Sequence, residues 1–245
     1  MAAQIELYLL ATLAWLLINA RELTSSAIIT QPSSYRLLGS HSSYAQYAPW
    51  HPCLNGTLVF EFKTHEPNGM LVYAQSLPYK YLHVSVADGN LRMRMRISEK
   101  DDPRGIFLAH QTTRVNDEKW HEVKLTRQNE RTTLTLDGIE LSHIHKEATL
   151  DGGDLHFGGG AHSSGVPNAD LLVIGGIPSS IETYDLSLGT ALFDSRFNGF
   201  IRNVKALNCS RPYLTRLDVK ASSDLRLVEN FFNVLKYYHG FLMHN

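Results

Sequence analysis

The chain has 245 residues, of which 43% are hydrophobic and 19% are charged, so it can bury a core and does not belong to the disordered class. Its formal net charge of −1 and its pI near 6.9 supply no overall positive field, which excludes nucleic-acid binding driven by global charge. The 17 Gly and nine Pro favour many turns between short elements over a long helical bundle.

The N-terminal segment contains a 12-residue apolar run from Leu7 to Ile18, which is shorter than the ~20 residues of a membrane-spanning helix. This length is typical of a signal-peptide core, with Ala20 as the cleavage position and Ala27 as the second choice. The flank carries Glu6 and no Lys or Arg, so an N-terminal anchor helix is the alternative. We expect residues 1–20 to be a signal peptide, residues 21–49 to be an entry arm, and the mature chain to be secreted.

The two cysteines, Cys53 and Cys209, gain meaning if the chain is exported, because an oxidising compartment lets them pair. A bridge that closes so long a loop would stabilise the fold by ~2–4 kcal/mol. Separate free thiols are the alternative. Two Asn-x-Ser/Thr sequons predict glycosylation of Asn55 and Asn208. Asn55 is the better acceptor, since a disulfide at Cys209 would obstruct its neighbour.

Strand signals begin at Thr57–Thr64, where apolar and polar residues alternate with the period of two of a half-buried strand. Gly69–Ala74 is a second strand. Tyr81–Ile97 reads as a hairpin around Asp88-Gly89, a dipeptide that tolerates the positive φ of a tight turn. The inward side chains of this hairpin should be Leu82, Val84, Val86, Leu91, Met93, Met95 and Ile97.

A second hairpin follows over Trp120–Leu141, with its turn at Asp137-Gly138. Leu171–Gly176 and Phe197–Leu207 are two further strand-like runs, and no sustained helical period occurs between Cys53 and Cys209. Many short strands separated by turns predict an all-β fold, an antiparallel sandwich of two sheets over one core.

These residues resemble a known family, the laminin G-like domains. The central match is Asp117-Glu118-Lys119-Trp120-His121-Glu122-Val123, followed by Arg127 and Leu134-Thr135-Leu136-Asp137-Gly138. Supporting matches are Phe60-x-Phe62-Lys63-Thr64 with Gly69-Met70-Leu71, Val173-Ile174-Gly175-Gly176-Ile177-Pro178, and Phe197-Asn198-Gly199-Phe200-Ile201-Arg202-Asn203-Val204. Within the family the sequence is most similar to the first such domain of neurexins.

The resemblance covers residues 50–212 and implies a jelly-roll sandwich without a catalytic centre. It also implies extracellular binding of protein or glycan partners, in relatives that continue to a plasma-membrane anchor. Residues 213–245 lie outside the match, and we expect a poorly ordered or helical tail without a membrane span. A stripe of Leu225, Val228, Phe232 and Leu235 that packs on the sandwich is the alternative.

Many laminin G-like domains hold one calcium ion at a rim of the sandwich through an Asp side chain, and the resemblance places Lys80 at that position. An ammonium group there removes a ligand and adds repulsion, so we expect calcium to be absent or bound weakly, with no other metal or cofactor. By the same alignment, the Ile97 carbonyl and Asn198 remain as ligands. Compensation by Asp88, Asp101 or Asp102 is the alternative.

Arg92, Arg94 and Arg96 alternate with apolar residues and should project from one strand face at ~7 Å intervals. Arginine forks suit sulfate and carboxylate groups, so heparan sulfate or an acidic protein is a candidate ligand. The alternative is a solvated face whose charges are balanced by neighbouring strands, for example by Glu61.

Catalytic signals are weak. His143 and His145 lie two apart on one strand face, but no third metal ligand has a diagnostic spacing. Gly158–Gly165 lacks the spacing of a phosphate loop or a nucleophile elbow, and His121 fits a packing and hydrogen-bonding position.

The function predicted is a non-enzymatic adhesion or recognition module that binds a cell-surface or matrix protein, without nucleic acid. Its contacts should lie on rim loops such as Ser98–Gln111 and Asp151–Asp170. A secreted lectin-like protein is the second hypothesis, and a secreted hydrolase is a distant third.

Overall fold

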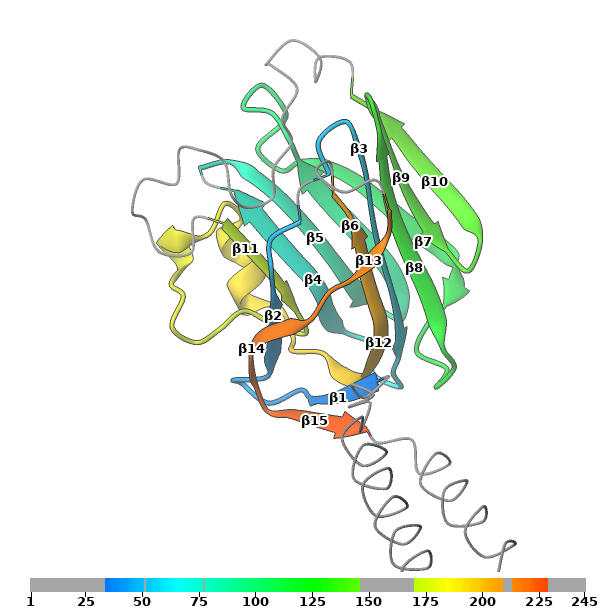
Figure 1. Cartoon of the computed structure of the whole chain (residues 1–245), viewed down its shortest axis with the longest axis vertical. Coiled ribbons are helices and arrows are strands. Elements are labelled where there is room, and N and C mark those ends of the chain that lie inside the picture. Colours follow the sequence, from blue (N-terminus) through cyan, green and yellow to red (C-terminus); the bar gives the residue numbers. More distant parts are fainter. Residues whose placement is uncertain (1–33, 51, 77, 146–169, 209–212, 229–245) are drawn as a thin grey trace, which may run out of the picture. The chain divides into compact units, whose positions relative to one another are not determined.

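The structure is a computed structural model that describes residues 34–50, 52–76, 78–145, 170–208 and 213–228. Within these residues the regular elements are strands and two short 3-10 helices (Figure 1). The first sheet contains, in spatial order, β10 (Ile139–Ile144), β9 (Arg131–Leu136), β8 (His121–Gln128), β3 (Asn55–Lys63), β12 (Asn198–Leu207), β1 (Ser34–Leu38) and β15 (Leu225–Val228), with β13 (Thr215–Arg216) beside β12. The second sheet contains β14 (Val219–Ser223), β2 (Tyr44–Tyr47), β11 (Asp170–Ile174), β4 (Gly69–Ser76), β5 (Lys80–Ala87), β6 (Asn90–Arg96) and β7 (Ile106–Arg114).

The main core lies between the two sheets, where apolar side chains from most of the strands meet. Phe60 and Phe62 of β3 are fully buried, and the Phe62 ring meets the Phe197 ring edge-on at 6.2 Å between centroids. Each such aromatic ring removes a large apolar area from water, and this burial stabilises the fold by about 25 cal/mol per Å². The predicted two-sheet antiparallel sandwich is therefore confirmed.

The predicted hairpin around Asp88-Gly89 is confirmed as β5 and β6, which pair from Tyr81 with Arg96 to Ala87 with Asn90. Asp88 and Gly89 both have positive φ, 53° and 73°, as a two-residue turn of this kind requires. All seven side chains expected to point inward are buried.

The second predicted hairpin belongs to a three-stranded meander of β8, β9 and β10. Asp137-Gly138 makes the turn from β9 to β10, with φ of 49° and 85°. Asn129, with φ of 51°, lies at the preceding turn from β8 to β9. The run therefore folds as three consecutive antiparallel strands.

The outer face of the second sheet is partly covered by the segment between β11 and β12, which contains η1 (Thr183–Asp185) and η2 (Gly189–Phe193). Tyr73 and Tyr81 lie in a second apolar cluster beneath this segment, with Ile177 and Ile181. β4 is consequently buried on both faces, which removes the alternation expected of a half-solvated strand. β6 contributes no residue to this cluster.

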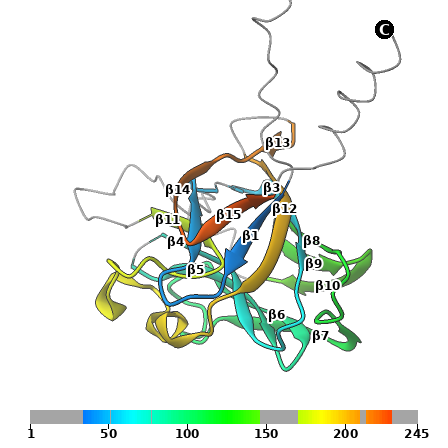
Figure 2. The same cartoon turned by 90° about the horizontal axis from the view of Figure 1, so that it is seen from below.

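The ends of the domain differ from the expected boundaries. Residues 34–38 and 44–47 of the expected entry arm form β1 and β2, inside the sandwich. Residues 215–228 of the expected tail contribute β13, β14 and β15, which pair with β12, β2 and β1 (Figure 2). Asp224, between β14 and β15, accepts hydrogen bonds from the hydroxyls of Ser40 and Ser42. Strand pairing therefore replaces the expected helix or disorder over this part of the tail.

Several expectations lie outside the described residues. These are the signal peptide over 1–20, the start of the entry arm, the Asp151–Asp170 rim loop up to residue 169 with its Gly158–Gly165 segment, Cys209 and the last part of the tail. The described residues contain no helix that is long and apolar enough to cross a membrane.

Candidate binding surfaces

The three arginines predicted to form a ladder lie on β6 and project from the outer face of the second sheet. Their neighbours Leu91, Met93 and Met95 are buried in the main core, so the arginines share the opposite face. Arg94 is exposed, while Arg92 and Arg96 are half-buried. We call Arg92, Arg94 and Arg96 the arginine face.

Each arginine of this face has a different environment. Arg92 Nη2 forms a salt bridge of 2.7 Å with Asp88 Oδ2. Arg94 lies over the Phe107 ring at 5.0 Å, and Phe107 of β7 is 48% exposed. Arg96 donates to the Glu99 carbonyl oxygen at 2.7 Å. Among the described residues, salt bridges reach only Arg92 of the three.

Glu61, named as a source of balancing charge, does not face these arginines. It lies on β3 in the first sheet, where its Oε2 accepts hydrogen bonds from Arg202 Nε at 2.8 Å and Nη2 at 2.5 Å. The charge that balances part of the arginine face comes instead from Asp88, at the turn of the same hairpin.

The segment Ser98–Gln111, expected to be a rim loop, is partly a strand, because β7 begins at Ile106 and pairs with β6. Only the first part of that segment is a loop. Asp101 organises it by accepting hydrogen bonds from the backbone N–H groups of Ile97 and Ser98 at 3.0 and 2.9 Å.

The residues aligned with a calcium site do not converge. Lys80 lies at the end of β4, because it pairs with Ser76, the last residue of that strand. Ile97 lies at the same end, because it directly follows Arg96, which pairs with Tyr81. Asn198 lies near the first residue of β4, since its carbonyl oxygen accepts from Thr64 and Phe197 abuts Gly69. An eight-residue strand is about 24 Å long, so one ion could not contact both ends.

The candidate compensating carboxylates are engaged elsewhere. Asp88 binds Arg92, Asp101 binds the loop backbone, and Asp102 Oδ1 accepts from the Arg104 backbone N–H at 2.7 Å. Within the described residues, no group of three or more His, Cys, Asp or Glu is arranged to hold a metal ion.

His121 ties together two turns at one end of the first sheet. Its Nε2 lies 2.9 Å from Asp117 Oδ1 and its Nδ1 lies 2.7 Å from Asp137 Oδ2. Hydrogen bonds from the Lys119 ammonium and from the His121 ring hold the pKa of Asp117 well below its usual range. Both ring nitrogens are occupied, which agrees with a packing and hydrogen-bonding role.

The paired histidines occupy unequal environments. The His143 and His145 rings are 4.9 Å apart and edge-on, but His145 is only 3% exposed. His145 Nε2 lies 3.1 Å from Thr132 Oγ1, which also accepts a hydrogen bond from buried Arg127 at 3.2 Å. Burial, followed by the positive charge of Arg127, lowers the pKa of His145 to about 4. The ring is therefore neutral at neutral pH and belongs to a buried polar cluster.

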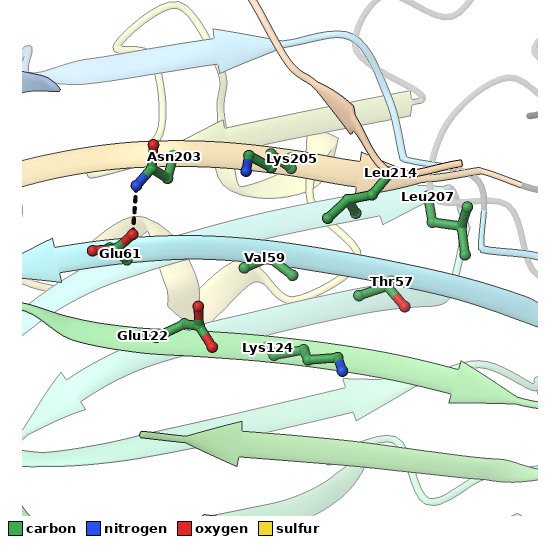
Figure 3. A pocket seen from close by; sticks show the side chains of 9 residues that line it. All are labelled: Thr57, Val59, Glu61, Glu122, Lys124, Asn203, Lys205, Leu207 and Leu214. Atoms are coloured by element: carbon green, nitrogen blue, oxygen red, sulfur yellow. Dashed lines mark hydrogen bonds between the residues drawn. The ribbon is translucent and has the colours of Figure 1, made fainter. Parts of the chain in front are cut away.

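Sequence reasoning missed a groove of about 390 Å³ on the outer face of the first sheet (Figure 3). Its walls come from β3, β8 and β12 and from the residue before β13. The lining residues are Thr57, Val59, Glu61, Glu122, Lys124, Asn203, Lys205, Leu207 and Leu214.

A β-bulge shapes one wall of the groove. The β3–β12 register shifts between Arg202 and Lys205, and Asn203 has a positive φ of 54°. Two successive side chains, Arg202 and Asn203, consequently both reach the Glu61 carboxylate. Figure 3 shows the Asn203 amide directed at Glu61, while Lys205 lies farther along β12.

Beside the groove, cations and aromatic rings alternate. The Arg202 guanidinium lies 4.0 Å from the Trp120 ring centroid, and Lys63 Nζ lies 4.7 Å from the Phe200 centroid. Arg36 covers Phe200 at 5.5 Å. These contacts hold the long basic side chains against the sheet.

The predicted glycosylation and disulfide sites lie partly within the described residues. Asn55 is exposed at the first residue of β3, so its side chain is accessible to a glycosyltransferase. The disulfide prediction for Cys53 and the sequon of Asn208 both depend on Cys209, which lies outside the described residues.

Comparison with known proteins gives a consistent result. A family model described as Laminin G domain matches residues 62–208. Neurexin 1 of Drosophila melanogaster is 28% identical over 205 residues, and Neurexin-2 of Mus musculus is 28% identical over 173 residues. These matches cover 82% and 68% of this chain but only 10% and 9% of the relatives, so the chain spans about a tenth of their length.

A solved structure, the mouse laminin alpha1 chain, domains LG4-5, shares the fold with a TM-score of 0.56 at 19% identity. That match covers 82% of this chain and 47% of the solved chain.

Proposed function

Because the chain belongs to the laminin G domain family, we propose that it is a non-enzymatic extracellular module that recognises a cell-surface or matrix protein. The similarity to neurexins over most of the chain supports this function. The described surface also supports it, since charged side chains stand at fixed spacing on rigid strands rather than converging on a catalytic pocket.

The arginine face is the site that we propose for a sulfated glycan such as heparan sulfate. The observation that carries this proposal is the alternation of Arg92, Arg94 and Arg96 with three core residues, which fixes the spacing of the guanidinium groups. Arginine recognises sulfate through two parallel hydrogen bonds. The exposed Phe107 ring beside Arg94 adds an apolar surface for a sugar ring.

Maturation is part of the same proposal. Removal of residues 1–20 would release the chain into an oxidising compartment, where Cys53 and Cys209 would pair and Asn55 would be glycosylated. We expect the mature product in the culture medium of a secreting cell line rather than in the membrane pellet after an alkaline carbonate wash.

The test of the glycan site is binding to immobilised heparan sulfate. The triple variant Arg92→Ala, Arg94→Ala, Arg96→Ala should bind much more weakly than the wild-type chain. The triple variant Lys119→Ala, Arg131→Ala, Lys220→Ala removes the same charge from exposed positions elsewhere and should bind as the wild type does. Equal losses in both variants would mean that only net charge matters and would contradict a specific site.

A glycan array separates the lectin-like alternative. Specific binding of one neutral sugar, with competition by the free monosaccharide, would favour the lectin function over protein recognition.

A further inference from the structure

We propose that the groove of the first sheet binds an extended protein segment whose side chains at alternate positions are acidic, basic and acidic. This site is distinct from the arginine face, because the two occupy outer faces of different sheets. The proposal goes beyond the proposed function by assigning a second surface and the chemistry of its partner.

The charge pattern of the groove and of the sheet surface next to it runs in three rows across the strands, of which the first two line the groove and the third lies beside it. In the first row, Lys205 and Lys124 flank Val59, since both pair with it in register. In the middle row, Glu61 lies beside Glu122. The third row contains Phe200 of β12 and Lys63 of β3, which pair directly.

Arg36 extends the third row, because it pairs with Phe200 across β1 and β12. Arg226 of β15 pairs with Arg36 in turn and is also exposed. Along the strand direction, the surface therefore carries a basic, an acidic and a second basic row. This local pattern exists although the formal net charge of the chain is only −1.

Three charges of the groove are available to a partner. Lys124, Lys205 and Glu122 are exposed, and among the described residues none of them is within salt-bridge distance of an opposite charge. Glu61, in contrast, is neutralised by Arg202. A ligand thus meets cations in the first row and an unpaired carboxylate in the second.

The spacing of the rows fits an extended peptide. Successive outward residues on a strand are ~6.8 Å apart, which is also the separation of alternate side chains along a bound extended segment. A segment parallel to β3 would place one acidic side chain near Lys124 and Lys205, a basic one near Glu122, and a second acidic one near Lys63. Its aliphatic atoms would contact Val59 and Leu214, which is 44% exposed.

A uniformly sulfated glycan fits this groove less well. Its anionic groups would repeat along the chain, and one of them would face the middle row, where Glu122 has no cationic partner among the described residues. The unpaired carboxylate between two basic rows therefore favours a partner of mixed charge.

The experiment is an NMR titration of the ¹⁵N-labelled mature chain with the capped peptide acetyl-Glu-Thr-Lys-Thr-Glu-amide. Amide signals of β3, β8 and β12 should shift. Each exposed ion pair contributes a factor of roughly 1.5 to 5 to affinity, so the double variant Lys124→Ala, Lys205→Ala should weaken binding about twofold to twenty-fivefold. Arg131→Ala with Lys220→Ala, two exposed positions outside the groove, should leave it unchanged.

A charge swap makes the test specific. The triple variant Lys124→Glu, Lys205→Glu, Glu122→Lys should prefer the inverted peptide acetyl-Lys-Thr-Glu-Thr-Lys-amide. All three side chains are exposed, so the variant should keep its fold, and unchanged amide signals of β5 and β6 would verify this.

Three results would overturn the proposal. The first is equal binding of both peptides to the wild-type chain, and the second is peptide-induced shifts outside the groove. The third is a heparin hexasaccharide that binds the groove through Lys124 and Lys205 while the peptide does not. The arginine face is tested separately, because its triple alanine variant on immobilised heparan sulfate leaves Lys124, Lys205 and Glu122 unchanged.

Discussion

His145 should make the fold sensitive to mild acid. Its ring is buried beside Arg127, and its pKa falls from the ordinary value of 6.5 to about 4. Between these two pH values the unfolded chain binds a proton at this histidine and the folded chain does not, so the free energy of unfolding falls as the pH falls.

The magnitude follows from that interval. Acidification from about pH 7.5 to about pH 4.5 should cost about 2 to 3 kcal/mol through this one group. The variant His145→Gln removes the titration and keeps a side chain able to hydrogen-bond Thr132. It should therefore lose less stability than the wild-type chain over the same pH change, by about that amount.

The assay is urea unfolding at the two pH values, followed by the fluorescence of Trp50 and Trp120. His143→Gln is the matched control, because its ring neighbours His145 but is only half-buried. This control should lose stability with acid nearly as the wild type does. If His145→Gln and the wild type lose the same free energy, or if the His145 ring titrates near 6.5 by NMR, the reasoning is refuted.

Four further expectations concern the backbone, the modifications and calcium. Gly175→Ala should cost about 2 to 4 kcal/mol in thermal unfolding, because φ is +87° and the new Cβ would lie 2.2 Å from a buried leucine carbon, whereas Gly138→Ala, at φ +85° with nothing within 4 Å, should cost only about 1 kcal/mol. Asn55→Gln should remove one glycan and increase gel mobility in protein from a secreting cell line. Non-reducing peptide mapping should recover a Cys53–Cys209 cross-link, and its reduction should lower the free energy of unfolding by ~2–4 kcal/mol. Isothermal titration with calcium should give no affinity tighter than about millimolar, and a micromolar value would contradict the loss of the rim ligand.

Strands with one buried and one solvated face, such as β3 and β8, could be predicted from their alternation. β6 alternates between buried and outward residues, and β5 carries the alternate core residues Leu82, Val84 and Val86, although Tyr81 and His83 on its other face are also buried. Both strands flank Asp88-Gly89, so pattern and turn chemistry agree. β7 was not predicted as a strand, because it is an edge strand with little burial, in which Phe107 and Gln111 are both exposed. Its residues therefore carried no period of two and were assigned to a rim loop.

The terminal strands could not be predicted for a different reason. β14 is exposed along most of its length and β15 is at most half-buried, so neither carries a strong hydrophobic signal. Both are held by backbone pairing to β2 and β1. Such pairing depends on which sheet edges lie nearby, and that information is not local.

The arginine face was visible in the sequence because its residues alternate on one strand. The groove was not visible, because Lys124, Lys205 and Glu61 come from three strands and meet only through the registers of β8, β3 and β12. An alignment that preserved basic residues at positions 124 and 205 together with acidic residues at positions 61 and 122 would be the signal able to find it.

The most direct test of the central claim, that this chain is an extracellular recognition module, is the binding of the purified mature protein to intact cells of its own organism. The account predicts saturable surface binding that falls when the cell-surface proteins or sulfated glycans are removed enzymatically. Binding should also fall in the Arg92, Arg94, Arg96 triple alanine variant, but not in the Lys119, Arg131, Lys220 control. Absence of saturable binding to any cell type of that organism, with the protein folded by NMR, would contradict the account.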